Sequence, residues 1–219
     1  MITDVVVVPG APLLLPEYQG RVPAVPGLLE ACVAAVRDAV ATAAHVVVVH
    51  ATDREPRSTR PAVGLRVADH LLASTHLGFE VEHVAVPWDA PTEECIALGR
   101  GVSADADTTL LVVADGSARR TEKAPGHLDA RAHEVDDGIV AAVRGAADGG
   151  LDDLLELDAD LCADLLVAGR APLQVLAAAV GAPTDKDGGT AYPGFEVVTC
   201  EVSDPLGVLY VVAHLARAR

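Results

Sequence analysis

The chain has few aromatic residues and few positive charges. Phe, Trp and Tyr together make up 3% of its 219 residues, too few for the aromatic platforms on which single-stranded nucleic acids stack. Only 16 Lys and Arg stand against 32 Asp and Glu, which gives a formal net charge of −16. Such a surface repels phosphate backbones and anionic lipid. The composition therefore argues against partners that are nucleic acids or membrane surfaces.

The sequence also lacks the common metal and membrane patterns. Cysteines 32, 95, 162 and 200 form no Cys-x-x-Cys pair, so we expect neither a zinc site nor a disulfide framework. No His-x-His or His-x-x-x-His pair supplies two metal ligands from one element. No apolar run approaches the roughly 20 residues of a membrane span, and residues 1–4 carry no basic segment of a secretory signal. We expect a cytoplasmic protein.

Short valine-rich runs alternate with segments of helical periodicity. This alternation is typical of a mainly parallel sheet covered by helices on both faces. We expect an α/β fold, a three-layer α/β/α sandwich with a mainly parallel or mixed central sheet. Because no linker or repeat divides the chain, a single domain is expected over residues 1–219.

The periodicity predicts the individual elements. Strands are expected at residues 5–8, 46–49, 79–86, 109–114, 195–203 and 206–213. Helices are expected at residues 26–43, 65–76 and 92–100, and between residues 130 and 180 with a break at 149–150 and starts near 158 and 171–172. A turn is expected at 185–189. The last two strands are predicted to form an antiparallel hairpin at or near an edge of the sheet.

Ligands of open α/β sheets bind beyond the carboxyl ends of the strands. That rule selects residues 9–10, 50–53, 87–88 and 115–121. His50 directly follows a predicted buried strand, although a histidine there is at least as often bonded to the backbone. Asp115 opens a charged loop, and such loops are usually only solvated. Ser117 lacks the Gly-x-Ser-x-Gly surroundings of a serine nucleophile.

At these strand ends the chain resembles the catalytic subunits of the class III extradiol ring-cleavage dioxygenases and the related Memo-like proteins. Residues 8–17 are similar to the family's opening Met-Pro-His-Pro-Pro segment, and residues 46–52 to a strand that ends in Ser-Pro-His. Residues 113–121 are similar to its Ser-Gly-Asp-Leu-Ser-His-Arg segment, and residues 195–213 to its closing strands. The resemblance implies the fold of the extradiol dioxygenase catalytic subunit. It also implies subunits that pair, so a homodimer or a partner subunit is expected at the C-terminal edge strand.

The same comparison shows what this chain lacks. Active family members hold ferrous iron with two His and one Glu, and a further His acts as acid and base. Those ligand positions fall on Gly10, Thr52 and Val167 here, and the acid/base position falls on Ala118. Gly, Val and Ala offer no side-chain ligand, and Thr is a poor one. We therefore expect no metal, no cofactor and no iron-dependent ring cleavage.

What remains is a frame around the lost side chains, including Asp115, Ser117, Arg119 and Gly169. Replacing His by Gly or Ala enlarges a strand-end cavity, and a metal-free pocket of this kind suits a small polar or anionic ligand. No catalytic residue is assigned, and His50 and Asp115 are the candidates. The expected pocket residues are Gly10, His50, Thr52, Asp53, Asp115, Ser117, Ala118, Arg119, Val167 and Arg170.

Three functions remain open at this point. The first is a dioxygenase-like protein without the iron site, which binds a small molecule or a partner. The second is an active metal-dependent oxidoreductase in which His50, with Asp53, Asp115 or His127, holds ferrous iron as relocated ligands. The third is a metal-free hydrolase or isomerase with Asp115, His50 or Glu122 as the general base, since burial beside a strand end raises the pKa of a carboxyl group.

Overall fold

The computed structural model describes residues 1–21, 24–55, 59–75, 78–102, 107–181 and 194–218. These residues build an α/β structure around one six-stranded mixed sheet, in the order β3-β2-β4-β1-β6-β5. The first four strands run parallel to one another, and β6 is antiparallel to both β1 and β5. The strands are β1 (Ile2–Val8), β2 (His45–Thr52), β3 (Glu80–Pro87), β4 (Thr108–Val113), β5 (Phe195–Ser203) and β6 (Tyr210–Arg217).

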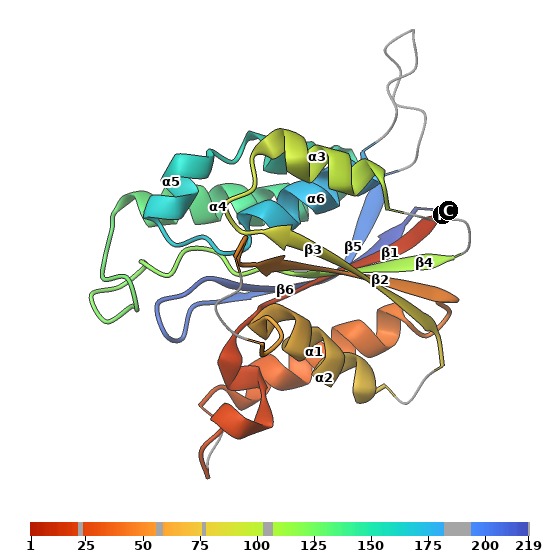
Figure 1. The fold of residues 1–219 in the computed structure, drawn as a ribbon, viewed down its shortest axis with the longest axis horizontal. Coiled ribbons are helices and arrows are strands. Elements are labelled where there is room, and N and C mark those ends of the chain that lie inside the picture. Colours follow the sequence, from red (N-terminus) through yellow and green to blue (C-terminus); the bar gives the residue numbers. More distant parts are fainter. Residues whose placement is uncertain (22–23, 56–58, 76–77, 103–106, 182–193, 219) are drawn as a thin grey trace, which may run out of the picture.

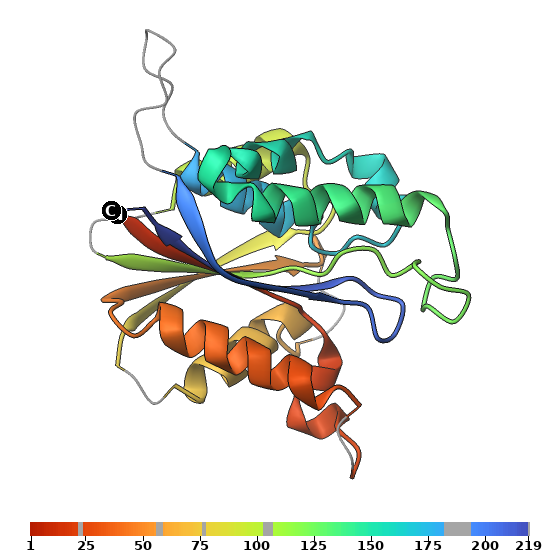
Figure 2. The same ribbon diagram turned by 180° about the vertical axis from the view of Figure 1, so that it is seen from behind.

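Helices cover both faces of the sheet, as predicted for an α/β sandwich (Figures 1 and 2). One face carries α1 (Pro26–Ala39) and α2 (Val63–Ala73). The other carries α3 (Thr92–Arg100), α4 (Arg131–Arg144), α5 (Ala159–Asp164) and α6 (Arg170–Val180). Short 3-10 turns complete the described elements: η1 (Pro12–Leu14), η2 (Pro16–Tyr18), η3 (Ala146–Asp148) and η4 (Gly150–Glu156).

The central strands are buried on both faces, which explains their continuous valine runs. In β1, Val5 and Val7 belong to the core shared with α4 and α6, whereas Val6 and Val8 belong to the core shared with α1 and α2. Strands β2 and β4 alternate between the two cores in the same way. Because neither face meets water, a parallel central strand needs no polar alternation. Each buried valine contributes about 1.5 kcal/mol or more of transfer free energy.

Several predicted elements coincide with the observed ones, but several boundaries were wrong; α1 ends at Ala39 rather than at residue 43, and α2 spans Val63–Ala73 rather than residues 65–76. Residues 92–100 and 195–203 are α3 and β5, and the Asp158 carboxylate accepts the Leu161 N–H (2.7 Å) at the predicted start of α5. Strand β6 begins at Tyr210 rather than at residue 206, because residues 204–209 form the connection, with Gly207 at φ +72°. Strand β2 continues to Thr52, so His50 lies inside the strand. The predicted turn at 185–189 lies outside the described residues.

Strand β5 forms an edge of the sheet and pairs antiparallel with β6, as predicted. Its outer surface exposes two apolar side chains, Val198 (54%) and Val202 (38%). Contact with a second copy or a partner subunit through this edge stays a prediction. Within the described part of the chain, no helix has both the length and the apolar character needed to cross a bilayer.

The carboxyl ends of the four parallel strands meet at one edge of the sheet. The register pairs Val113 of β4 with both Val8 of β1 and His50 of β2, and pairs Thr52 with Pro87 of β3. The residues that follow these ends are therefore brought together, in the place where α/β sheets bind ligands.

Candidate functional site

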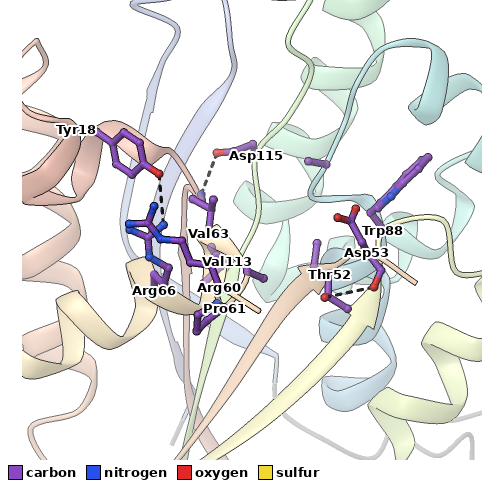
Figure 3. Close-up of a pocket in the computed structure, with 15 residues that line it drawn as sticks. Tyr18, Thr52, Asp53, Arg60, Pro61, Val63, Arg66, Trp88, Val113 and Asp115 are labelled. Atoms are coloured by element: carbon purple, nitrogen blue, oxygen red, sulfur yellow. Dashed lines mark hydrogen bonds between the residues drawn. The ribbon is translucent and has the colours of Figure 1, made fainter. Parts of the chain in front are cut away.

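A cavity of about 440 Å³ lies at this edge of the sheet (Figure 3). One side carries Tyr18, Arg60 and Arg66, and the opposite side carries Thr52, Asp53 and Trp88, with Asp115 between them. Its lining residues are Gly10, Tyr18, Ala51, Thr52, Asp53, Arg60, Pro61, Ala62, Val63, Gly64, Arg66, Trp88, Val113, Asp115 and Ala168. Most of them are apolar or glycine, so the few charged groups determine what the cavity recognises.

Asp115 is a half-buried carboxyl group in this cavity. It follows the end of β4, and its Oδ1 accepts a hydrogen bond from the Gly10 backbone N–H (3.0 Å). Burial raises the pKa of Asp115 to about 7, although the hydrogen bond from Gly10 opposes that rise. The carboxyl group therefore changes its charge near neutral pH, and its protonated form can donate a hydrogen bond to a ligand.

Two glycines keep the space beside Asp115 open. A Cβ on Gly10 would lie 3.2 Å from Val113 Cγ1 and 3.4 Å from Asp115 Oδ2, and one on Gly64 would lie 3.3 Å from the same Val113 atom. The resemblance expected from the sequence would place an iron-binding histidine at Gly10. A side chain there would be in contact with Asp115, so its absence leaves the carboxyl group accessible from the cavity.

The positive charges of the cavity lie on one side. Arg66 belongs to the first turns of α2 and its side chain is only 14% exposed, whereas that of Arg60 is 57% exposed. Both guanidinium groups lie over the Tyr18 ring, 5.6 Å (Arg66) and 6.0 Å (Arg60) from its centroid. Arg66 also donates to the Tyr18 hydroxyl (3.5 Å). This arrangement holds two cations together at one wall.

The amino-terminal end of α2 lies at the same wall. No side chain among the described residues caps this helix, whose N-cap residue is Ala62. The Arg66 N–H bonds to the Ala62 carbonyl (3.1 Å), so the N–H groups of the three residues before it lack helical acceptors. Val63 and Gly64, two of these three, line the cavity. N–H groups without acceptors in the helix and the positive end of the helix dipole both favour an anion at this place.

The opposite wall is held by a buried arginine. Arg170, at the start of α6, is 2% exposed, and its Nη2 donates to the carbonyl oxygens of Trp88 (3.0 Å) and Ala90 (2.5 Å). Its Nη1 donates to Gln174 Oε1 (2.8 Å). The guanidinium group thus fixes the chain that carries Trp88 but does not line the cavity. The prediction that Arg170 is a pocket residue was wrong, because its side chain is buried and bonds to two backbone carbonyls and to Gln174.

Of the ten pocket residues expected from the sequence, four line the cavity: Gly10, Thr52, Asp53 and Asp115. His50 does not. The residue is 3% exposed, and Nδ1 of its ring lies 3.2 Å from the Ala51 carbonyl oxygen, so the backbone satisfies this ring nitrogen. Burial lowers the pKa of His50, because it disfavours the charged form of the ring. Its expected role in the pocket is therefore not supported.

The remaining expected residues lie in or under the charged loop that follows β4. Ser117 is fully buried and its hydroxyl donates to the Leu165 carbonyl (2.8 Å), while Ala118 packs against the core beneath α1 and α2. Val167 is buried in the other core. Arg119 is half-buried outside the cavity, and its Nε has no hydrogen-bond partner among the described residues. The resemblance predicted Ala118 and Val167 as pocket residues, and the strand-end rule selected Ser117 and Arg119, but none of the four lines the cavity.

A buried ion pair explains why this loop is held against the protein. Asp136 of α4 is fully buried; its Oδ1 accepts the Ser117 N–H (2.8 Å) and its Oδ2 accepts from Arg120 Nη1 (2.9 Å). Arg120 Nε also donates to Asp204 (2.9 Å). Burial raises the pKa of Asp136, and the hydrogen bonds from Ser117 and Arg120 oppose that rise. Arg120 thus stabilises the loop rather than lining the cavity.

Leu166, beside the cavity-lining Ala168, has a strained backbone with φ 56° although its side chain is 45% exposed. A left-handed conformation costs a leucine roughly 1 kcal/mol. Leu166→Gly should therefore change the free energy of unfolding by less than about 0.5 kcal/mol, because relief of strain offsets the added chain entropy. The control is Leu128→Gly, equally exposed (45%) but without a positive φ, which should lose about 1 kcal/mol. Equal losses in urea unfolding would contradict this account.

The side chains at the positions where the expected resemblance would place iron ligands do not fit ferrous iron. Gly10 has no side chain, Val167 is buried in the core, and Thr52 offers a single hydroxyl. The relocated ligands considered above do not converge either. Across the described ranges, no three His, Cys, Asp or Glu side chains are grouped as a metal site would require. His127, for example, lies 3.4 Å from the Glu122 carbonyl oxygen in the exposed part of the loop.

Four of the most polar or aromatic cavity residues were not predicted as pocket residues: Tyr18, Arg60, Arg66 and Trp88. The strand-end rule did select Trp88. The other three belong to segments that follow β1 and β2, and no sequence pattern predicts that these segments lie against the cavity. Comparison with known proteins adds no constraint, because no family model matches the chain and no curated protein is found to match it. Its function must therefore be argued from the cavity.

Proposed function

We propose that the chain binds a small carboxylate with an apolar body in the strand-end cavity. We also propose that it is a divergent relative of the class III extradiol dioxygenase catalytic subunits and Memo-like proteins, without iron-dependent ring cleavage. The main support for this binding function is the position of the Arg60 and Arg66 guanidinium groups. They lie beside the uncapped end of α2, in a cavity that is otherwise mainly apolar.

The charge arrangement supports an anionic end on the ligand. Arg66 is largely withdrawn from water, so its attraction for an anion is screened less than that of a surface arginine. Planar guanidinium groups form paired hydrogen bonds with carboxylates. The N–H groups at the start of α2 add donors directed at the same region.

The rest of the cavity supports an apolar body of modest size. A volume of about 440 Å³ lies within the range of roughly 300–1,000 Å³ that is usual for small-molecule sites. Val63, Val113 and Trp88 offer apolar surface between the two polar walls. Asp115, uncharged below its pKa of about 7, can donate a hydrogen bond to an acceptor on the ligand without repelling it.

Benzoate and benzamide test the proposal, because they have the same shape and differ in charge. Wild-type protein should bind benzoate more tightly than benzamide. Arg66→Ala should weaken benzoate binding about 10- to 100-fold, the effect of losing one charge-assisted contact, and should leave benzamide binding nearly unchanged. Isothermal titration calorimetry, or chemical shift titration for weak binding, measures both constants.

Arg37→Ala is the matched control, since Arg37 is an exposed arginine of α1 (60%) away from the cavity. This variant should bind benzoate like the wild type. Equal affinities for benzoate and benzamide in the wild type, or equal effects of the two arginine substitutions, would overturn the proposed charge recognition.

Metal-free proton transfer, as in hydrolysis or isomerisation, is a second candidate. It is favoured by one observation, the pKa of about 7 that burial gives Asp115 inside the cavity, since a general base works best near the ambient pH. Neither His50 nor Glu122, the other bases considered, lines the cavity. Hydrolysis of p-nitrophenyl acetate that rises with pH through about 7 and disappears in Asp115→Asn would support this candidate. A rate unchanged by that substitution would exclude Asp115 as the base.

The iron-dependent alternative has its own test. The protein is loaded anaerobically with ferrous iron and desalted, and its metal content is measured by mass spectrometry. We expect iron far below one equivalent, because the donor set does not fit. Retention of a full equivalent would mean that ligands lie elsewhere in the chain and would reinstate the dioxygenase reaction.

A further inference from the structure

One carboxylate inside the protein already contacts both cationic groups of the cavity. Glu17, in η2, accepts hydrogen bonds at the same oxygen, Oε1, from Arg66 and from Arg60 Nη2 (3.2 Å for Arg60). The arginines are 43 and 49 residues away in the sequence, so the fold brings these groups together. Tyr18, the next residue, supplies the ring that lies against both guanidinium groups.

The position of Glu17 differs from that of its partners. Arg60, Arg66 and Tyr18 line the cavity, but Glu17 does not, and its side chain is 45% exposed. The carboxylate therefore approaches the arginines from the rim. The two guanidinium groups share one carboxylate oxygen there, which uses part of their hydrogen-bonding capacity.

We propose that Glu17 is a specificity-determining residue of the cavity: its carboxylate occupies the guanidinium pair in the free protein and is replaced by the carboxylate of the ligand. This inference rests on the proposed function. The carboxylate of Glu17 is the same chemical group as the proposed ligand's carboxylate, attached to the protein itself. The ligand class is therefore a carboxylate that reaches the same two arginines.

Competition from Glu17 increases the selectivity of the cavity for charged over uncharged ligands. A carboxylate ligand recovers the contacts that Glu17 gives up, and Glu17 then turns to water, which its exposure allows. An uncharged ligand of the same shape cannot recover those contacts, so it leaves Glu17 in place. The binding free energies of charged and uncharged ligands therefore differ, because only a charged ligand replaces the contacts that Glu17 makes in the free protein.

The test is Glu17→Gln, which keeps the size of the side chain and removes its charge. Benzoate should bind this variant about five-fold more tightly than the wild type, because exchange with the two ion pairs of the partly exposed Glu17 carboxylate no longer opposes binding. Benzamide binding should not change. Glu17→Ala should tighten benzoate binding in the same direction. Glu30→Gln, at an exposed position of α1, is the matched control and should leave both constants unchanged.

The outcomes separate this inference from the proposed function. If benzoate binds neither the wild type nor Glu17→Gln, the proposed function itself fails. If the wild type binds benzoate through Arg66, but Glu17→Gln binds it equally or more weakly, only the competitor role fails and Glu17 merely fixes η2 against α2. A purely structural role would also weaken benzoate and benzamide together, whereas the competitor role moves benzoate alone.

Discussion

Replacing Gly169 by alanine should lower the free energy of unfolding by more than about 3 kcal/mol. A Cβ at this position would lie 2.5 Å from the Asp115 carbonyl oxygen and 2.7 Å from both the Asp115 backbone nitrogen and Ala114 Cβ. Two of these neighbours are backbone atoms just beyond β4, and they cannot rotate aside. The Gly169 N–H also bonds to the same Asp115 carbonyl (2.9 Å), so any separation of the two segments breaks that bond.

The substitution should also weaken benzoate binding, because displacement of Asp115 changes the wall of the cavity. Gly138→Ala is the matched control. Gly138 is exposed on α4, and a Cβ there would meet nothing within 4 Å among the described residues, so alanine should raise the free energy of unfolding by about 0.5–1 kcal/mol. Urea unfolding followed by circular dichroism measures both. A loss below about 1 kcal/mol for Gly169→Ala would show that the two segments can separate freely.

The sequence predicts the sheet well because its signal is local. Strands β1, β2 and β4 are buried on both faces, so each is a run of apolar residues bounded by polar ones or glycine. Once the strands are placed, the rule that ligands bind beyond their carboxyl ends follows from topology alone. That rule was enough to find Gly10, Thr52, Asp53 and Asp115.

The rest of the site depends on contacts between distant segments. Arg66 belongs to the stretch predicted as a helix, and nothing in the periodicity indicates that Glu17 and Tyr18 lie against it. Some polar residues were instead predicted as pocket residues although they bond within the protein. Arg170 and Ser117 looked like ligand-binding groups, yet backbone carbonyls accept their hydrogen bonds, the Ala90 carbonyl for Arg170 and the Leu165 carbonyl for Ser117. Their partners lie 80 and 48 residues away, and no local pattern reveals them.

Asp115→Asn should make the protein more stable above neutral pH and leave its stability nearly unchanged near pH 4. Burial raises the pKa of Asp115 from 3.8 in the unfolded chain to about 7 in the folded protein. Below both values the carboxyl group is protonated in either state and contributes no difference. Between them the folded state binds more protons than the unfolded state, so stability falls as pH rises and reaches its lower level above about 7. The full difference corresponds to about 4 kcal/mol.

Asparagine keeps an oxygen for the Gly10 N–H and cannot ionise, so the variant should lose this pH-dependent term. The quantity to measure is the difference in unfolding free energy between Asp115→Asn and the wild type, from urea titrations at several pH values. It should rise from near zero at acid pH to its full value above pH 7. Asp137→Asn, at an exposed position of α4, should show no such rise. A constant difference for Asp115→Asn would mean that burial does not hold its proton.

The same ionisation connects stability to binding. Above pH 7 the ionised Asp115 places a negative charge in the cavity that the proposed carboxylate ligand enters, and like charges at close range repel strongly where water is scarce. Benzoate should therefore bind the wild type less tightly as pH rises through about 7, and this dependence should disappear in Asp115→Asn. Benzamide binding should show no such dependence in either protein. A protein that binds its ligand best when Asp115 is protonated takes up a proton on binding, because the ligand's charge favours the neutral carboxyl group.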